Sequence, residues 1–455
     1  MVSIKSSYNV IPNEPTPKGP FWLSDNDQMV RWGHTSFIYI YKEQPNLNAI
    51  EILKDSLSKI LVPYYPIAGR LRYVENGRLE LDCNTKGVKL VEADNTKTLA
   101  EYGDFSPNNE TFKELIPMVD YTQPIEELPL MLVQLTRFYG IGQGVSIGVS
   151  ISHPLTDGFA IIRFINSWAK LARGETLETS ELFPVLDRSI LKSPHPPLAP
   201  RFDHAELKPF PLMLGSSDHL AEKRKKVSVV TLKLTSEQVE RLKKKVNDQS
   251  QKEGSRPYSR YEAIAAYIWR CASKARELDH LQPTQLLFVV EFRNRLNPPL
   301  PKNYFGNAFA PTVTPTCYIG DIISKPLSYV AQKIREANEL INNDYIWSQQ
   351  DFIKCHKKLD ELRPSFPFQG EHKKNSPFYG NPNLHIVSWM HMQWHEADFG
   401  WGKPIYFGPA LVYPSDKVYL IRSSNDSIII SMHFQIAHMT LFTKFFWEDI
   451  LDSRL

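Results

Sequence analysis

A histidine and an aspartate four residues apart follow an alternating apolar segment, and this pair could carry out acid–base chemistry. Between residues 145 and 151 every odd position is apolar, a pattern typical of a strand with one buried face. The same period of two places His153 on the buried face, and Pro154 then ends the strand. Because an imidazole at such a position can take a proton from a bound nucleophile, we predict that His153 is a general base.

Asp157 lies where this strand is expected to turn into a helix. Apolar residues recur at helical spacing over 159–171, so the local frame is predicted to be strand, tight turn and amphipathic helix. A carboxylate at that turn can accept backbone N–H groups or pair with a distant arginine, and we expect Asp157 to brace the loop that carries His153. A second H-x-x-x-D pentad, at 356–360, contains two lysines and is interpreted as a solvated helix face.

Length and composition favour two domains and a small-molecule substrate. The chain has 455 residues, 42% of them hydrophobic, which is enough for two cores. The net charge of +3, without a basic stripe interleaved with aromatic residues, argues against a nucleic-acid partner. Residues 1–6 lack the apolar core of a signal peptide, and no run approaches the roughly 20 apolar residues that span a bilayer. We therefore expect a protein of the cytosol with no membrane partner.

The spacing of cysteines and histidines does not indicate a metal centre. The four cysteines are scattered without C-x-x-C spacing, which argues against both a zinc site and a disulfide framework. His391 and His395 are four residues apart, but the surrounding alternation predicts a strand, where that spacing does not converge on one ion. The residues alone leave two further functions open, a metal-dependent hydrolase with His153 or His391 as a ligand and a noncatalytic binding protein.

A proline-rich segment over 183–226 is the one long stretch that favours neither helix nor strand, so we interpret it as a stiff connector. The predicted domains are residues 1–182 and 227–455, and the fold class is α/β or α+β with mixed sheets. Predicted strands lie at 38–41, 227–234, 286–290, 383–393, 405–412, 417–421 and 427–434, and predicted helices at 48–61, 235–250, 261–275 and after 435.

Four motifs in order along the chain resemble those of one family, the plant BAHD acyltransferases. They are H-x-x-x-D-G at 153–158, D-F-G-W-G at 398–402, an R-x-R pair followed by Y-F-G-N at 293–307, and Y-Y-P-x-A-G-R at 64–70. The resemblance covers nearly the whole chain.

The resemblance implies two chloramphenicol-acetyltransferase-like domains joined by a long crossover, with a channel between them. An acyl-coenzyme A co-substrate would enter from one side and the acceptor from the other, with no bound cofactor and no metal. It implies that His153 deprotonates the acceptor without a covalent acyl-enzyme and that Asp157 pairs with Arg293 away from the channel. Separately, we expect the enzyme to be a monomer. The D-F-G-W-G motif would be structural and remote from the channel, through Asp398, Gly400, Trp401 and Gly402.

Other positions match channel residues of the family less specifically. Trp389 could donate to the developing oxyanion or could only pack in the core. His34 and Tyr39 match positions that border the acyl pocket, and Ser388 and His391 are expected on the acceptor side. Ser259 and Asn307 match regions that face coenzyme A, although the capping role of Ser259 with Glu262 already explains that serine.

Within the family, segments at 298–301, 377–384, 387–389 and 437–439 resemble the spermidine hydroxycinnamoyltransferases. This likeness implies transfer of a hydroxycinnamoyl group to a polyamine nitrogen. A polyamine is a cation, so carboxylates are expected at the acceptor site; Asp351 is the first candidate, the alternative being a surface helix aspartate. The alternative function is O-acylation of shikimate, quinate or an alkaloid alcohol, although Val387 stands where shikimate-using relatives commonly have threonine.

Overall fold

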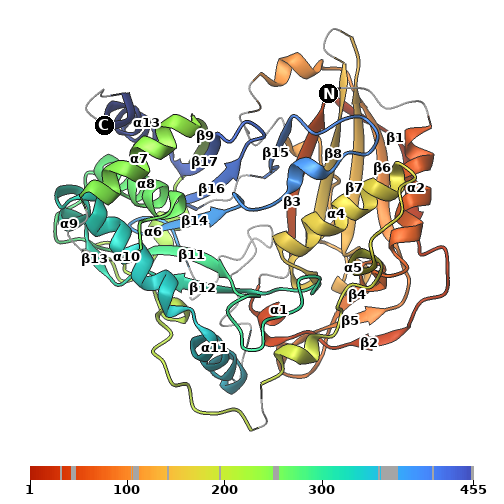
Figure 1. Ribbon diagram of the computed structural model, residues 1–455, viewed down its shortest axis with the longest axis horizontal. Helices are drawn as coiled ribbons and strands as arrows, with labels where there is room; N and C mark the ends of the chain where they lie inside the picture. Colours follow the sequence, from red (N-terminus) through yellow and green to blue (C-terminus); the bar gives the residue numbers. More distant parts are fainter. Residues whose placement is uncertain are drawn as a thin grey trace.

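The computed structural model describes residues 1–30, 33–42, 48–103, 105, 112–140, 143–193, 196–249, 256–356, 359, 378–411 and 415–451. Within them the protein forms two lobes, each built on a six-stranded sheet with helices packed against it (Figure 1). Both sheets combine parallel and antiparallel pairs. The predicted mixed α/β fold with two lobes is therefore confirmed.

The N-terminal sheet has the strand order β1-β6-β7-β8-β3-β15. Its hydrophobic core lies between the sheet and two helices, α2 (Ala49–Ile60) and α4 (Gly158–Ala172). The alternation at 145–151 forms β8 as predicted, buried along its whole length. The strands are β1 (Val2–Val10), β6 (Val88–Asn95), β7 (Met131–Phe138), β8 (Gly144–Ser152), β3 (His34–Tyr41) and β15 (Tyr406–Pro409).

The C-terminal sheet has the order β12-β11-β14-β16-β17-β9. The predicted capping boxes of Thr235 with Gln238 and Ser259 with Glu262 begin two of its helices. The strands are β12 (Phe309–Val313), β11 (Leu286–Glu291), β14 (Leu384–Ser388), β16 (Lys417–Arg422), β17 (Ile428–Gln435) and β9 (Val227–Leu234), and the helices are α7 (Ser236–Asp248), α8 (Arg260–Arg276), α10 (Leu327–Leu340), α11 (Asn343–Cys355) and α13 (Ile436–Leu451).

Shorter elements complete the described part of the chain. A small sheet of β2, β5 and β4 lies beside α1 at the base of the N-terminal lobe (Figure 1). These elements are α1 (Asp25–Met29), β2 (Gly19–Phe21), β4 (Arg70–Tyr73), β5 (Leu79–Cys83), α5 (Thr179–Leu182), α6 (Leu220–Lys223), β10 (Pro283–Thr284), β13 (Cys317–Tyr318) and α9 (Ile319–Ser324).

The segment 183–226 crosses from one lobe to the other along the lower edge of the molecule in Figure 1. Apart from α6 and an isolated bridge between Val185 and Tyr304, its described residues form only short turns of helix, at Arg188–Leu191 and Ala205–Leu207. The prolines at 209 and 211, like those at 196 and 197, remove backbone donors and so favour this extended path.

One segment of the second half of the chain belongs to the N-terminal lobe. β15 pairs with β3 in antiparallel register, with Phe407 opposite Tyr39. Trp394 and Phe399, from the residues before β15, are buried in the N-terminal core. The predicted division at 227–455 is therefore corrected here, because strand pairing and core packing place the segment ending in β15 with the first sheet.

The strand predicted at 383–393 ends at Ser388. Residues 389–393 turn instead, and the Met392 N–H donates to the Trp389 carbonyl at 3.2 Å. The side chains of Trp389 and Met392 are buried against the N-terminal core, so tertiary packing overrides the alternating pattern. His391 consequently lies in an exposed turn, and three residues of the second H-x-x-x-D pentad, 357, 358 and 360, lie outside the described residues.

Candidate active site

His153 lies at the point where β8 ends and a short helical turn, His153–Leu155, begins. Its backbone N–H donates to the Gly33 carbonyl at 3.0 Å, and its carbonyl accepts from Asn307 Nδ2 at 3.0 Å. The centre of its ring is 5.7 Å from that of Phe309 in the other lobe. The histidine backbone is thus held from both lobes, while the side chain stays half-buried.

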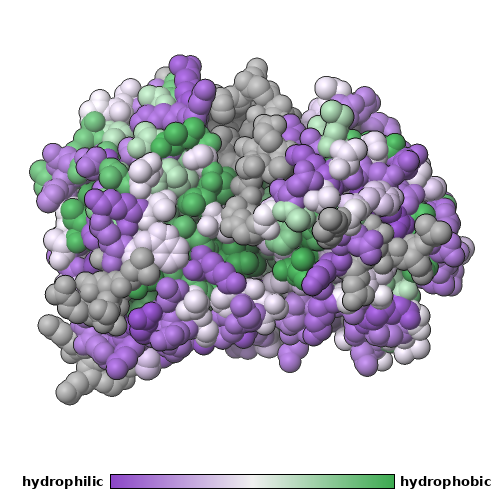
Figure 2. All heavy atoms as spheres, turned by 90° about the horizontal axis from the view of Figure 1, so that it is seen from above, coloured by the Kyte–Doolittle hydropathy of each residue, from purple (hydrophilic) through white to green (hydrophobic). Residues whose placement is uncertain are grey.

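A cavity of about 1040 Å³ lies between the lobes, and His153 is part of its wall. The N-terminal lobe contributes Phe37 and Phe159 to the wall, β12 of the C-terminal lobe contributes Phe309, and the connector contributes Phe210. Trp389, directly after β14, also lines it. Figure 2 shows hydrophobic side chains gathered in the hollow between the two lobes. A long, mostly apolar cavity with a titratable side chain in its wall is the usual form of a small-molecule site.

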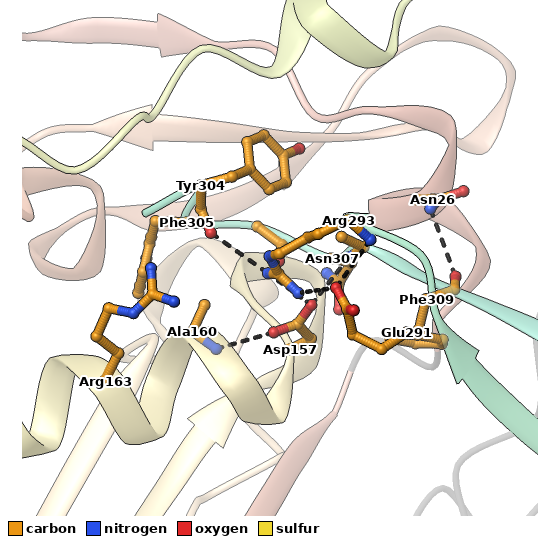
Figure 3. A network of polar contacts seen from close by, with 12 residues as sticks. Asn26, Asp157, Ala160, Arg163, Glu291, Arg293, Tyr304, Phe305, Asn307 and Phe309 are labelled. Carbon is orange, nitrogen blue, oxygen red and sulfur yellow. Dashed lines mark hydrogen bonds and ion pairs between the residues drawn. The ribbon is translucent and has the colours of Figure 1, made fainter. Parts of the chain in front are cut away.

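Asp157 is the N-cap of α4 and is buried. One carboxylate oxygen accepts from the Ala160 N–H at 2.9 Å, and the other accepts from the Ala308 N–H at 2.9 Å and pairs with Arg293 at 2.9 Å. Figure 3 shows the carboxylate between Ala160 and Arg293. All three partners hold the carboxylate in place, so Asp157 braces the loop of His153.

Arg293 joins Asp157 to a second carboxylate, that of Glu291, whose Oε1 lies 3.1 Å from Arg293 Nη1 (Figure 3). Arg293 Nη2 also donates to the carbonyls of Tyr304 and Gly306. Burial by itself lowers the pKa of Arg293, but the two carboxylates outweigh burial and hold the pKa above its usual value. The pair predicted between Asp157 and Arg293 is therefore present, but Asp157 borders the cavity, so its predicted position away from the channel is corrected.

A second buried cluster, of Asp27, Arg188 and Asn307, supports the loop that carries His153. Asp27 of α1 accepts from the backbone N–H and the side-chain amide of Asn307, at 3.1 and 2.7 Å. Arg188 of the connector lies 3.5 Å from Asp27 and donates to the Leu155 carbonyl at 2.8 Å and to the Phe305 carbonyl. This cluster ties α1, the connector and the C-terminal lobe to the turn that carries His153.

Four more of the predicted site residues line the cavity: Ser259, Ser388, Trp389 and His391. Trp389 is buried and packs its ring against Phe407 and Tyr419, with centroids 5.4 and 4.9 Å apart. Ser259 caps α8, where its hydroxyl accepts from the Glu262 N–H at 3.2 Å.

Three other predicted site residues, His34, Tyr39 and Asn307, lie away from the cavity wall. Both ring nitrogens of His34 are engaged, by the Tyr121 hydroxyl at 2.9 Å and the Pro129 carbonyl at 2.8 Å. Tyr39 is fully buried among aromatic rings, and its burial raises the pKa of the phenol. Asn307 holds Asp27 and the His153 carbonyl, so the structure gives it a supporting position and not one facing coenzyme A.

Asp351 is neither a surface residue nor a cavity residue. It lies on α11 with 2% of its surface exposed, while Gln349 and Ile353 of the same helix line the cavity. Asp351 is two positions away from both residues, so its side chain points to another face of the helix. The solvated position considered from the sequence is therefore corrected, and the structure places Asp351 outside the cavity wall.

The D-F-G-W-G motif is a tight turn that does not line the cavity. Gly400 and Gly402 have φ of +97° and +81°, a backbone conformation that favours glycine. Trp401 packs edge-on against Tyr41 with centroids 5.6 Å apart, and the Asp398 side chain accepts from the Gly400 N–H. Arg173 of the N-terminal lobe donates to the Asp398 carbonyl. Packing and hydrogen bonding account for the whole motif.

Asp27, Arg188 and Glu291 support the site but were not predicted from the sequence. Asp27 and Arg188 lie in segments without periodicity, and only the folded chain brings them together. Glu291 could have been found, because it ends the apolar strand 286–290 and directly precedes the R-x-R pair.

Within the part of the chain that the structure describes, no group of three His, Cys, Asp or Glu side chains could hold a metal ion. None of the four cysteines, all within the described ranges, is in a disulfide; Cys355 is exposed and the others are buried. None of the helices in the described ranges is long and apolar enough to cross a membrane.

Comparison with known proteins gives matches over the whole length. The Transferase family profile matches residues 1–449. The chain is 42% identical to hydroxycinnamoyl-CoA:piscidic acid hydroxycinnamoyltransferase of Actaea racemosa, over 99% of this chain and 100% of that protein. It is 38% identical to shikimate O-hydroxycinnamoyltransferase of Nicotiana tabacum (98% and 99%) and 36% identical to anthranilate N-benzoyltransferase protein 2 of Dianthus caryophyllus (98% and 99%). Its fold is similar to that of vinorine synthase, with a TM-score of 0.67, 22% identity and coverage of 97% and 96%.

Proposed function

Because the chain belongs to the Transferase family, that of the BAHD acyltransferases, and therefore uses an acyl-coenzyme A co-substrate, we propose that it transfers a hydroxycinnamoyl group to an amine of a polyamine such as spermidine. The observation that carries the acyl-transfer chemistry is the position of His153 in the wall of a cavity shared by both lobes. Two substrates entering such a cavity can meet at the imidazole.

In the proposed mechanism, His153 takes the proton from the acceptor nitrogen as that nitrogen attacks the thioester carbonyl. The carbon–nitrogen bond forms, the carbon–sulfur bond breaks, and the coenzyme A thiolate receives the proton from His153. Trp389, which lines the same cavity, is the proposed donor to the oxyanion that forms in between. Asp157 acts only through the loop, because its oxygens are taken by Ala160, Ala308 and Arg293.

The two substrates are supported by different observations. A hydroxycinnamoyl donor is named in two of the relatives, from Actaea racemosa and Nicotiana tabacum. Transfer to nitrogen is named in the Dianthus caryophyllus relative, which is similar over its whole length. The polyamine itself rests on the segments at 298–301, 377–384, 387–389 and 437–439 and on valine at position 387. We further propose that the enzyme acts as a monomer in the cytosol.

A second candidate is O-acylation of an acceptor such as shikimate, quinate or an alkaloid alcohol. The acceptors in the names of the three relatives are all acids, namely piscidic acid, shikimate and anthranilate. An acid would need a cation beside the reacting group, and the cavity wall contains cationic side chains, among them Arg295, Lys208 and Lys417.

The test is to incubate the protein with p-coumaroyl-CoA and, separately, spermidine, putrescine, shikimate, quinate and an alkaloid alcohol. Amide formation with the polyamines is expected, identified by product mass; ester products alone would establish the second candidate. His153→Ala should lower kcat by about 10²–10⁴-fold, the usual contribution of a general base. His356→Ala, in the second H-x-x-x-D pentad, is the matched control and should be unaffected. Acyl groups covalently bound to quenched enzyme would contradict the mechanism.

A further inference from the structure

Four carboxylates line the cavity, and they differ in how many of their oxygens are already bonded. Asp218 lies on the connector, where its Oδ1 accepts from the Leu220 N–H at 2.9 Å. Glu206 is fully engaged, because Oε1 accepts from Gln349 and contacts His204 while Oε2 accepts from Tyr345. Asp157 is engaged in the same way on both oxygens. In the described residues, all the hydrogen bonds and ion pairs of Glu291 use Oε1, so Oε2 remains available to a ligand.

Glu291 also lies close to the reaction centre. It is the last residue of β11 and stands opposite Phe309 in the antiparallel pairing with β12. Phe309 in turn contacts the ring of His153, with centroids 5.7 Å apart. Glu291 lines the cavity with 28% of its side chain exposed, and Figure 3 shows its carboxylate between Arg293 and the backbone of Phe309. Glu291 and His153 therefore line the same cavity and are linked through the side chain of Phe309.

From this geometry we propose that Glu291 binds a protonated amine of the acceptor, so that a neighbouring neutral nitrogen meets His153. The inference rests on the proposed polyamine function and names the residue that recognises the substrate. Arg293 holds the carboxylate in place through Oε1, which reduces the side-chain entropy lost when the ligand binds. A half-buried carboxylate attracts an ammonium group more strongly than an exposed one, because solvent screens it less.

The same carboxylate gives a reason for selectivity. An acceptor that carries its own carboxylate close to the reacting group would place two negative charges beside each other, and such repulsion discriminates between substrates. Asp351, the acid expected from the sequence, cannot take this role because it does not line the cavity.

The test compares Glu291→Gln with wild type on two acceptors, spermidine and butylamine, which has no second amine. We expect kcat/KM for spermidine to fall about tenfold or more, the effect of losing one charge-assisted hydrogen bond, mainly through KM. The value for butylamine should change by no more than about twofold, and Glu291→Asp should restore part of the spermidine activity. Glu92→Gln is the matched control, because Glu92 pairs with Arg137 at similar exposure but lies outside the cavity wall.

The outcomes separate the two proposals. Equal losses for spermidine and butylamine would show that Glu291 acts only by positioning Arg293, and would overturn the inference while leaving the polyamine function intact. An unchanged spermidine KM would also overturn it. If wild-type enzyme forms no amide with any polyamine, the proposed function and this inference both fail.

Discussion

Replacing Asp27 with asparagine should destabilise the fold strongly although the side chain keeps its shape. Asp27 and Arg188 are both fully buried, and their charges compensate each other at 3.5 Å. The Asp27 oxygen that faces Arg188 also accepts from the Ser24 N–H and hydroxyl, at 3.0 and 2.7 Å. In Asp27→Asn an amide N–H₂ group can replace this oxygen, which leaves the guanidinium without a counter-charge and the Ser24 donors without an acceptor.

Breaking a buried ion pair from one side costs about 3–5 kcal/mol. For a cooperative unit of 150–250 residues, each kcal/mol lowers Tm by about 2–4 °C, so a fall of about 6–20 °C is expected. The assay is thermal and urea unfolding of wild type, Asp27→Asn, Arg188→Met and the double variant. The double variant should recover part of the loss, because neither charge is then buried alone. Strictly additive effects, or a loss below about 1 kcal/mol in Asp27→Asn, would refute the argument.

Two further predictions concern pH and the glycine turn. Burial lowers the pKa of His433 to about 3, so the folded protein resists protonation there, and stability present above pH 6.5 is lost as the pH falls from about 6.5 towards 3. Between pH 7.5 and pH 5.0 the loss in the free energy of unfolding should be about 2 kcal/mol smaller in His433→Gln than in wild type, measured with urea; equal losses would contradict this assignment. Gly402→Ala should lower the free energy of unfolding by about 1–2 kcal/mol, because alanine is strained at a φ of +81°. No atom lies within 4 Å of the added methyl group, so no steric clash adds to this cost. The KM values should stay unchanged; an altered KM would place the motif at the cavity.

The sequence predicts well the features that depend on local pattern. The alternation at 145–151 predicts β8, and the capping pairs at 235–238 and 259–262 predict the starts of α7 and α8. The role of Asp157 could also be anticipated, because an aspartate at a strand-to-helix turn has few other uses.

Features that depend on distant partners could not be predicted in this way. The helix α11 carries Gln349 and Asp351 in one polar run, and only its packing decides that Gln349 faces the cavity while Asp351 is buried elsewhere. His34 was predicted to border the acyl pocket, but Tyr121 and Pro129 hydrogen-bond to both of its ring nitrogens. Neither partner can be inferred from the spacing of residues in the sequence. The strand β14 ends before Trp389 because the Trp389 ring packs in the N-terminal core instead of continuing the alternation of the strand.

The pairing of β15, from the second half of the chain, with the N-terminal sheet limits how this enzyme can open. Since β15 is hydrogen-bonded to β3 and the segment before it is embedded in the opposite core, the two halves are fastened together on one side. A large hinge motion that separates the lobes would break the hydrogen bonds between β15 and β3. We therefore expect substrates to reach His153 through the cavity between the lobes. An isolated first half would present β3 as a bare sheet edge, a surface prone to self-association, which makes the two halves unsuited to separate production.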